Sequence, residues 1–422
     1  MTNQNTTTKP NQVSRDVVIV GGGLAGLPLA LALSAHGVSV SVIDVLDPLS
    51  ATDAAFDGRI SSIALASSRM LQHLGVWADL AAHAQPIADI VVTDGKVREG
   101  ASPFFLHFDH EEIGDEPLGY MIENRYLRIA LLKAVSRAIE KGEPLELLAP
   151  AKVSSLNLDS TQPVVSLVDG RELVADLCVA ADGRGSMVRD WAGFKTIGWD
   201  YGQLGIVTTV EHALPHEGVA QELFLPSGPF AILPMVDNRS SLVWTEKSEL
   251  GRAIMGLDDV RFAQECEARF GSYLGKVTPV GPRWSYPLSL QLAQDYVKPG
   301  VALIGDAAHG IHPLAGQGLN LGLRDVAALA QVVVEAKRLG LGMGQMNVLE
   351  RYQTWRRFDN VSLALVCDGL NRLFSNDIGP LRFVRDLGLG LVNKVAPARK
   401  LFMRHAGGTV GELPKLMQGR EI

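Results

Sequence analysis

The pattern of apolar and polar residues predicts a chain that combines buried strands with helices. Residues 17–20 and 301–304 are short, continuously apolar runs, as expected of parallel strands that are buried on both faces. Each run leads through a glycine-rich turn into a helical stretch, over residues 27–35 after the first and from about residue 317 after the second. Between residues 196 and 287, apolar and polar residues alternate instead, which predicts an antiparallel sheet. The pattern therefore favours an α/β fold with a second, β-rich region.

The turn after the first strand has the glycine spacing of a dinucleotide-binding motif. Gly21 permits the tight turn, Gly23 allows a pyrophosphate to approach the backbone, and Gly26 allows the helix to pack closely on the strand. The next apolar run ends at Asp44, where a carboxylate is placed to accept hydrogen bonds from the hydroxyls of an adenosine ribose. This motif by itself does not distinguish NAD from FAD.

Residues 305–325 make that distinction. Asp306 follows the strand at residues 301–304, and we expect a buried carboxylate there that accepts hydrogen bonds from sugar-like hydroxyls. A Gly- and Pro-rich loop comes next, and the helix after it presents free N–H groups to an electron-rich ligand. A polyol chain ending in a ring that becomes anionic on reduction fits both features, and this describes the flavin of FAD. A third turn, at Asp182 and Gly183, follows another apolar strand.

These three motifs, in this order, resemble those of the class A flavoprotein aromatic monooxygenases, and the resemblance runs from about Asp16 to the C-terminal region. Residues 312–320, followed by Gly322 and Asp325, are similar to the signature of the ubiquinone-biosynthesis hydroxylases, the 2-polyprenylphenol hydroxylase branch. Residues 57–65 and 368–375 also resemble that branch. The resemblance implies an FAD-binding Rossmann-like domain of the glutathione-reductase type, an antiparallel β-sheet substrate domain and a helical C-terminal region.

Because the three motifs lie far apart in the sequence, the FAD-binding domain must be assembled from discontinuous segments. We expect this domain to comprise residues 15–85, 112–195 and 288–345. The substrate domain would comprise residues 86–111 and 196–287, and the C-terminal helical region residues 346–422. Residues 1–14 are polar and are expected to form a disordered tail that lacks the character of a signal peptide or a membrane anchor.

The resemblance also implies which residues contact FAD. On the pyrophosphate and ribose side, these are Gly21, Gly23, Gly26, Asp44, Arg59 and Asp182. Asn124, at a predicted helix start, falls where many relatives carry an FAD-contacting Arg or Gln. For Asn124 and Arg125, helix capping and solvent exposure account for the residues as well as cofactor contact does. On the ribityl and ring side, the implied contacts are Asp306, Pro313, Gly316, Gly318 and the backbone of Leu319 and Asn320. Pro313 would lie near the reactive edge of the flavin.

The implied activity is FAD-dependent hydroxylation of the ring of a polyprenylated phenol with O2, through a flavin C4a-hydroperoxide. The cofactor performs the difficult step in such enzymes, so we nominate no catalytic side chain. No second glycine motif follows a strand, so NADPH, NADH or a partner reductase would act as a transient electron donor near Arg59. Three alternatives stay open: hydroxylation of a soluble small phenol, reduction of prenyl chains, and a flavin-fold protein without enzymatic activity.

Composition excludes several other classes. The formal net charge of −7 argues against a nucleic-acid-binding protein. Cys178, Cys266 and Cys367 are widely spaced, so we expect buried free thiols and neither a disulfide framework nor a zinc site. His309 and His312 lack a matching carboxylate spacing, so no metal site is predicted.

Residues 381–404 differ from the rest of this acidic chain because they mix basic and apolar residues. Segments of this kind bind the interface of anionic bilayers, although packing on the FAD domain or on a partner subunit would also account for them. We expect a cytoplasmic protein that is peripheral on the inner membrane. Membership of a ubiquinone-biosynthesis complex and a homodimeric state are left open by the resemblance.

Overall fold

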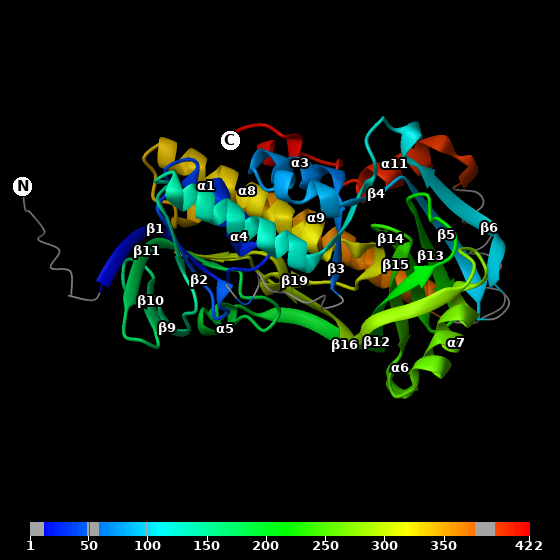
Figure 1. Cartoon of the computed structure of the whole chain (residues 1–422). Coiled ribbons are helices and arrows are strands. Elements are labelled where there is room, and N and C mark those ends of the chain that lie inside the picture. The colour runs from blue at the N-terminus through cyan, green and yellow to red at the C-terminus, as the bar shows by residue number, and fades with distance from the viewer. Residues whose placement is uncertain (1–11, 49, 51–58, 98–99, 376–392) are drawn as a thin grey trace, which may run out of the picture.

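The computed structural model of the chain describes residues 12–48, 50, 59–97, 100–375 and 393–422, and two large sheets dominate it (Figure 1). The first sheet consists of β1 (Gln12–Val20), β2 (Val40–Ile43), β8 (Leu145–Leu148), β9 (Val153–Asn157), β10 (Val164–Leu167), β11 (Glu172–Ala180), β17 (Val297–Lys298) and β18 (Val301–Leu303). Its order is β17-β18-β11-β1-β2-β8, with β10 and β9 attached to β11. The five strands from β18 to β8 are parallel, as the buried apolar runs predict.

The N-terminal strand begins earlier than the sequence pattern indicates. Residues 12–14, assigned above to a disordered tail, belong to β1, so that part of the prediction is wrong. Gln12 pairs with Glu172 and Ser14 with Val174 of β11. The long partner strand β11 supplies backbone hydrogen bonds that extend β1 beyond its apolar core, independently of side-chain character.

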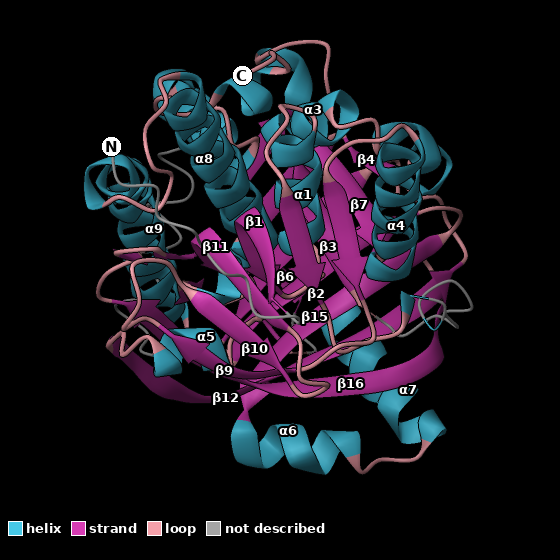
Figure 2. Cartoon of the chain, turned by 90° about the vertical axis from the view of Figure 1, so that its left-hand side faces the viewer, coloured by secondary structure: helices cyan, strands magenta, loops and turns pink. Residues whose placement is uncertain are grey.

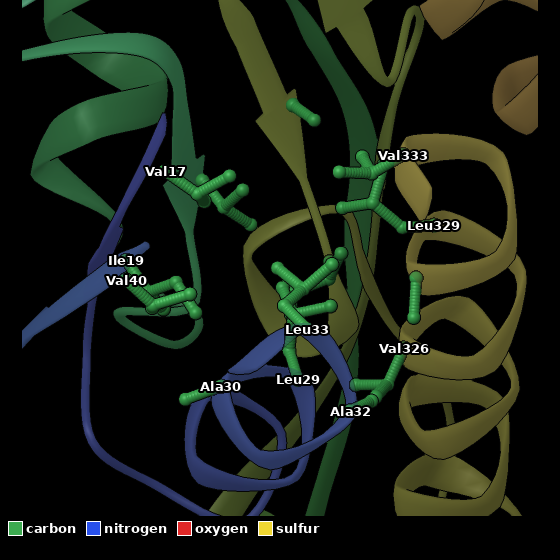
Figure 3. Packing of buried hydrophobic residues seen from close by; sticks show 14 of the residues in the cluster. Val17, Ile19, Leu29, Ala30, Ala32, Leu33, Val40, Val326, Leu329 and Val333 are labelled. Carbon is green, nitrogen blue, oxygen red and sulfur yellow. The ribbon is translucent and has the colours of Figure 1, made fainter. Parts of the chain in front are cut away.

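Three helices cover one side of the first sheet: α1 (Gly26–Ser34), α4 (Asn124–Glu140) and α8 (Gly318–Arg338) (Figures 1 and 2). Figure 3 shows Leu29 and Leu33 of α1 between Val17 of β1 and Val326 of α8, all of them buried. α1 is apolar on every side because it is enclosed by the sheet and by its neighbours. This packing fixes the first turn of the chain, after β1, against the start of α8.

The second sheet consists of β5 (Asp89–Lys96), β6 (Gly100–Asp109), β12 (Thr196–His212), β13 (Val219–Leu225), β14 (Gly228–Met235), β15 (Arg239–Lys247), β16 (Val277–Ala293) and β19 (His309–Gly310). Its order is β19-β16-β12-β15-β14-β13-β5-β6, antiparallel except for the β13–β5 pair. The long strands β12 and β16 belong to the second sheet, and one end of this strand pair lies beneath the first sheet (Figure 1). Helices α6 (Ser248–Met255) and α7 (Asp259–Phe270) pack on one face of the second sheet, through Ile254 and Phe262 against Phe230 and Trp244.

A small third sheet consists of β3 (Ile60–Ala64), β7 (Gly119–Glu123) and β4 (Gln85–Ile87). It contacts β14 of the second sheet and the helices α4 and α8 that cover the first. The remaining helices are α3 (Leu65–His73), α5 (Met187–Trp191), α9 (Met346–Phe374) and α11 (Ala396–Ala406), with short 3-10 turns between elements. The predicted fold class is confirmed, since a mixed α/β half with a parallel sheet joins an antiparallel sheet and a helical C-terminal part. The exact domain boundaries given above stay a prediction.

Candidate functional site

The carboxyl ends of four parallel strands meet at one edge of the first sheet. The register aligns the last residues of β1, β2, β11 and β18 side by side. Open parallel sheets bind their ligands outside this edge. The structure therefore brings together turns that are distant in the sequence, and these turns carry Gly21, Asp44, Asp182 and Asp306.

Glycines at the first of these turns are required by close backbone contacts. Gly21 has a φ of +109°, and a Cβ atom there would lie 2.3 Å from the carbonyl oxygen of Ala181. A Cβ on Gly26 would lie 1.8 Å from the carbonyl oxygen of Gly21. Gly23 is different, because a Cβ there would meet no protein atom within 4 Å. Gly21 and Gly26 thus shape the turn, whereas Gly23 borders open space beside it.

The carboxylate of Asp44, directly after β2, is held by two backbone N–H groups. One carboxylate oxygen accepts a hydrogen bond from the Gly22 N–H at 2.7 Å, and the other accepts one from the Leu46 N–H at 2.8 Å. Asp44 also lines a shallow hollow together with Gly22 and Arg128 of α4. We did not predict Arg128; its signal is its position one helical turn after Asn124, on the same face of the same helix.

Asp182 lies in the turn after β11, and only one of its two carboxylate oxygens accepts a hydrogen bond from a described residue. Its Oδ2 accepts a hydrogen bond from the Val188 N–H at 3.2 Å, whereas Oδ1 is buried without a partner among the described residues. Nε of Arg184, two residues further on, is also buried without a partner in the described part of the chain. Buried polar atoms are nearly always hydrogen-bonded in native proteins, so these atoms mark a place where a ligand or water completes the bonding.

Asp306 lies in a 3-10 turn, η4 (Gly305–Ala307), directly after β18. The expectation that its carboxylate is buried is wrong, because Asp306 is exposed while Gly305 and Ala307 are buried. The 3-10 turn directs the two small residues inward and leaves the acidic side chain at the surface of the sheet edge. A carboxylate in that position is accessible to the hydroxyl groups of a ligand.

The start of α8 lies in the same region. The turn η5 (Leu314–Gly316) precedes it, and Gly316 has a φ of +61°, with Pro313 partly buried ahead of it. A Cβ on Gly318, the first residue of α8, would meet no atom within 4 Å. The N-cap residue Gln317 makes no side-chain capping hydrogen bond, and the first N–H groups of an α-helix lack intrahelical partners. The backbone at Leu319, in that first turn, is therefore placed to bind an electron-rich group.

The side chain of Asn320 has a structural role. Its Oδ1 accepts hydrogen bonds from the Ala64 N–H at 2.8 Å and the Ser67 hydroxyl at 2.9 Å, and its Nδ2 donates to the Ser62 carbonyl at 2.9 Å. These bonds tie the start of α8 to the end of β3. Only the backbone of Asn320 is left to contact a cofactor.

Arg59, Asn124 and Arg125 lie around the third sheet. Arg59 is exposed, and its carbonyl accepts a hydrogen bond from the Asn124 N–H at 2.9 Å. The Ser61 hydroxyl donates to Asn124 Oδ1 at 2.6 Å. Arg125 pairs with the buried Glu123 carboxylate at 2.6 Å, and Glu123 lines a cavity of about 150 Å³ that extends to β14 and β15. The structure thus places Arg59 and Asn124 together and pairs Arg125 with Glu123.

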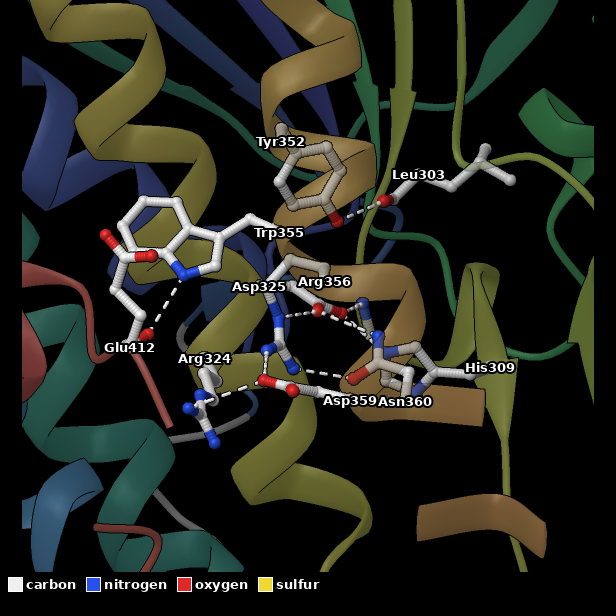
Figure 4. Close-up of polar contacts among 11 residues, drawn as sticks. Leu303, His309, Arg324, Asp325, Tyr352, Trp355, Arg356, Asp359, Asn360 and Glu412 are labelled. Atoms are coloured by element: carbon white, nitrogen blue, oxygen red, sulfur yellow. Dashed lines mark hydrogen bonds and ion pairs between the residues drawn. The ribbon is translucent and has the colours of Figure 1, made fainter. Parts of the chain in front are cut away.

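A buried ion network behind η4 escaped the sequence analysis (Figure 4). Asp325 of α8 is fully buried, with Oδ2 at 2.5 Å from His309 Nε2 and at 3.1 Å from the Gly305 N–H that donates to it. Its Oδ1 accepts hydrogen bonds from Arg356 Nε of α9 at 2.9 Å and from Asn360 Nδ2 at 3.1 Å. Burial opposes ionisation of Asp325, but His309 and Arg356 hold its pKa below the usual value. The network joins α8 and α9 to the turn that carries the exposed carboxylate.

The three cysteines are free and buried, as predicted. Burial raises the pKa of the Cys178, Cys266 and Cys367 thiols to about 12.

Within the described parts of the chain, no helix combines the length and the apolar character that spanning a bilayer requires.

Comparison with known proteins identifies the family. A family model described as an FAD binding domain matches residues 14–360. Ubiquinone hydroxylase UbiL of Rhodospirillum rubrum is 51% identical over 96% of this chain and 92% of that protein. The 3-demethoxyubiquinol 3-hydroxylase of Escherichia coli is 36% identical over 93% of this chain and 98% of that protein. The chain belongs to the FAD-dependent ubiquinone-biosynthesis hydroxylase family.

A solved structure supports the fold of this hydroxylase family member. p-Nitrophenol 4-monooxygenase PnpA from Pseudomonas putida DLL-E4 matches with a TM-score of 0.76 and 18% identity, covering 95% of this chain and 99% of that one. The predicted family, the FAD cofactor and the class of enzyme, an FAD-dependent aromatic-ring monooxygenase, are confirmed. NAD(P)H is the electron donor typical of the family.

The residues at the sheet edge of the hydroxylase fit FAD. Gly23 and Gly318 border open space that a side chain would fill, and Asp182 has a buried carboxylate oxygen without a protein partner. The N-termini of α1 and α8 favour a negatively charged group nearby. When bound, reduced FAD supplies, with O2, the oxygen atom that enters the aromatic ring. The chain itself has to bind the cofactor, orient the ring and exclude water.

Proposed function

We propose that this FAD-dependent hydroxylase acts on the aromatic ring of a polyprenylated phenol in ubiquinone biosynthesis. The names of the relatives described above refer to ubiquinone or demethoxyubiquinol. Within this chain, the observation that supports the proposal best is an apolar face that extends from the loop before α8 to the C-terminal helix α11. A prenyl chain requires such a face, whereas a small soluble phenol requires only a pocket for its ring.

Two adjoining clusters of apolar side chains form this face. Phe224 of β13 packs with Leu314 of the loop before α8, and its ring stacks on Phe374 of α9 at 4.0 Å between centroids. Val92 of β5 packs against this first cluster and against a second one. The second cluster contains Met403 of α11, so apolar packing continues from the loop before α8 to the C-terminal helix. These side chains are buried, with Phe224 4% and Met403 0% exposed, so a prenyl chain would have to insert between them.

The FAD contacts are part of the proposal. The open space at Gly23 supports placing the pyrophosphate there, and Asp44 supports the adenosine ribose position at the end of β2. The exposed Asp306 would bind the ribityl hydroxyls. The other proposed contacts are Gly21, Gly26, Arg59, Asn124, Arg125, Asp182, Pro313, Gly316, Gly318, Leu319 and Asn320.

The electron donor would reach the flavin transiently beside Arg59, an exposed residue near the cofactor edge of the sheet. Stopped-flow reduction of the bound flavin by NADPH and by NADH tests this part of the proposal. Failure with both nucleotides would indicate a protein donor, and tight stoichiometric binding of NADPH would contradict a transient encounter.

The enzyme would work at the surface of an anionic membrane. Leu401 and Phe402 of α11 are 52% and 48% exposed, and Phe104 and Phe105 of β6, the strand that α11 packs against, are 45% exposed. Lys400 of α11 adds positive charge beside them. Exposed aromatic and basic residues on two adjoining elements suit the headgroup region of a bilayer. Residues 381–392 of the basic, apolar segment lie outside the described residues.

Sedimentation with anionic vesicles tests the membrane proposal. We expect the double substitution Leu401→Asp with Phe402→Asp to reduce binding at least tenfold. Leu339→Asp provides a matched control, because Leu339 is 71% exposed but lies at the end of α8. Equal binding by all three proteins would show that α11 is not the contact, and this apolar surface would then fit a partner subunit instead.

The substrate proposal is tested in a strain that lacks this gene. Mass spectrometry should show a polyprenylated quinone precursor that lacks one oxygen atom, and wild-type protein should remove it. Normal ubiquinone levels together with accumulation of an unprenylated phenol would instead favour a soluble phenol as the substrate.

A further inference from the structure

Glu222 places a carboxylate on the apolar face described above. It lies in β13, where it pairs with Ala231 of β14 and with Val92 of β5. Side chains of a strand alternate between faces, so Glu222 lies on the same face as Ala220 and Phe224. In the described chain, no hydrogen bond or ion pair satisfies this carboxylate, and the residue keeps part of its surface accessible. An acidic side chain in such surroundings requires an explanation.

The strand neighbours of Glu222 pack toward the loop before α8, on the side of the molecule where the flavin would bind. Its neighbour Phe224 packs with Leu314 of the loop before α8, and its register partner Val92 packs against both apolar clusters. Ala220, on its other side, belongs to the cluster that contains Met403. Glu222 therefore lies on the strand face that joins the cluster of Leu314, in the loop that would face the flavin ring, to the cluster of Met403.

We propose that Glu222 is a catalytic residue that accepts the proton of the substrate's phenolic hydroxyl. This inference rests on the proposed function. A polyprenylated phenol has one strongly polar end and an apolar remainder, and Glu222 is a polar group within an otherwise apolar face. A phenol bound with its tail toward α11 would present its hydroxyl to this carboxylate.

The proton transfer balances as follows. The O–H bond of the phenol breaks and its proton moves to the Glu222 carboxylate, which raises the electron density of the ring. The ring carbon then receives one oxygen atom of O2 as a hydroxyl group, while reduced FAD would supply two electrons and the second oxygen atom would leave as water after taking up a proton from solvent. The C–H bond at that carbon breaks, its proton leaves to solvent, and Glu222 returns its own proton to the phenolic oxygen. The carboxylate is regenerated at the end of the turnover.

The proton affinity of Glu222 suits this role. Burial raises the pKa of its carboxyl to about 8, and no charged neighbour contributes to that shift. A general base works best when its pKa lies near the operating pH, and an ordinary carboxylate is too weak a base for a phenol. The titratable groups on the elements around this face include Asp94 and Lys96 of β5, Cys367 and Asp368 of α9, and His312 in the loop before α8. Burial lowers the pKa of His312 to about 4, so His312 is neutral in the range where Glu222 titrates.

The test compares Glu222→Gln with the wild-type holoenzyme and with the control Glu211→Gln, at an exposed position of β12, which β14 and β15 separate from β13 in the same sheet. The isosteric amide should preserve the fold and the FAD content. We expect Glu222→Gln to lower kcat for a prenylated phenol on the order of 10²-fold with little change in KM. The wild-type rate should rise with pH to a plateau above about 8, and this dependence should vanish in the variant.

The acidity of the substrate separates catalysis from structure. A prenylated nitrophenol ionises near neutral pH without a base, so Glu222→Gln should hydroxylate it at close to the wild-type rate, whereas an ordinary prenylated phenol should show the full defect. Wild-type kcat and an unchanged pH profile in Glu222→Gln would overturn the role of Glu222 and leave the proposed function intact. A wild-type holoenzyme that hydroxylates no prenylated phenol would overturn both.

Discussion

Replacement of Asp325 by Asn should destabilise the protein strongly, because this carboxylate is the centre of a fully buried network. Asp325 accepts hydrogen bonds from the Gly305 N–H, Arg356 and Asn360 and pairs with His309. The substitution keeps the volume of the side chain but removes its charge, which leaves the buried guanidinium of Arg356 without its main partner. Breaking a buried pair in this way costs about 3–5 kcal/mol.

Asp359→Asn is the matched control. Asp359 also pairs with Arg356, at 2.8 Å, but its side chain is 30% exposed, so its loss should cost at most about 1 kcal/mol. Urea unfolding of the holoenzymes, followed by flavin fluorescence and circular dichroism, measures both effects. Equal midpoints for Asp325→Asn and wild type would refute the reasoning, as would a larger loss in Asp359→Asn.

The stabilising effect of Asp325 should also depend on pH. Its pKa is lowered in the folded protein, so the unfolded state binds more protons at acid pH. The contribution is fully present above the unfolded pKa, about 3.9, and is lost as the pH falls toward the folded pKa. The difference in stability between wild type and Asp325→Asn should therefore be constant near neutral pH and shrink below about pH 4. A difference that grows on acidification would contradict this sign.

Four shorter predictions concern the cofactor and the thiols. Asp306→Ala should weaken FAD binding by one to two decades, about 1.5–3 kcal/mol, in a fluorescence titration, and wild-type affinity would count against the ribityl assignment. Gly23→Val should yield colourless, folded protein, because the open space at this position would be filled; full flavin occupancy would exclude Gly23 from the cradle. Acid precipitation should release all yellow colour, whereas a coloured pellet would reveal a covalent link. Cys178 and Cys266 should resist thiol reagents until the protein unfolds, since both are fully buried with raised pKa values.

The parts of the fold that depend on local sequence were predictable. The apolar run at residues 17–20 lies in β1, and Gly21 and Gly26 stand where any side chain would collide with backbone. The contact of Gly26 with Gly21 joins residues close in sequence, and the positive φ of Gly21 is a local requirement, so the spacing of the glycines records both. The alternating run at residues 204–210, which lies in β12 of the second sheet, is likewise a local pattern.

Features that depend on partners far apart in the sequence were not predictable. Asp325 and Arg356 are separated by 31 positions and meet because α9 packs beside α8, which no periodicity reveals. The exposure of Asp306 follows from the 3-10 geometry of its turn, and residues 12–14 became a strand because β11 was there to pair with them. Glu222 reads as an ordinary polar position in an alternating strand, and only the packing of β13 against the loop before α8 gives it significance.

The most direct test of the central claim is transfer of labelled oxygen by the purified holoenzyme. The protein, reconstituted with FAD and a nicotinamide donor, is supplied with isotopically labelled dioxygen, a prenylated phenol in anionic vesicles and the corresponding unprenylated phenol. The account predicts a hydroxylated prenylated product that carries one labelled oxygen atom, formed well ahead of any product from the unprenylated ring. Oxygen derived from water, or preferential hydroxylation of the unprenylated phenol, would contradict it.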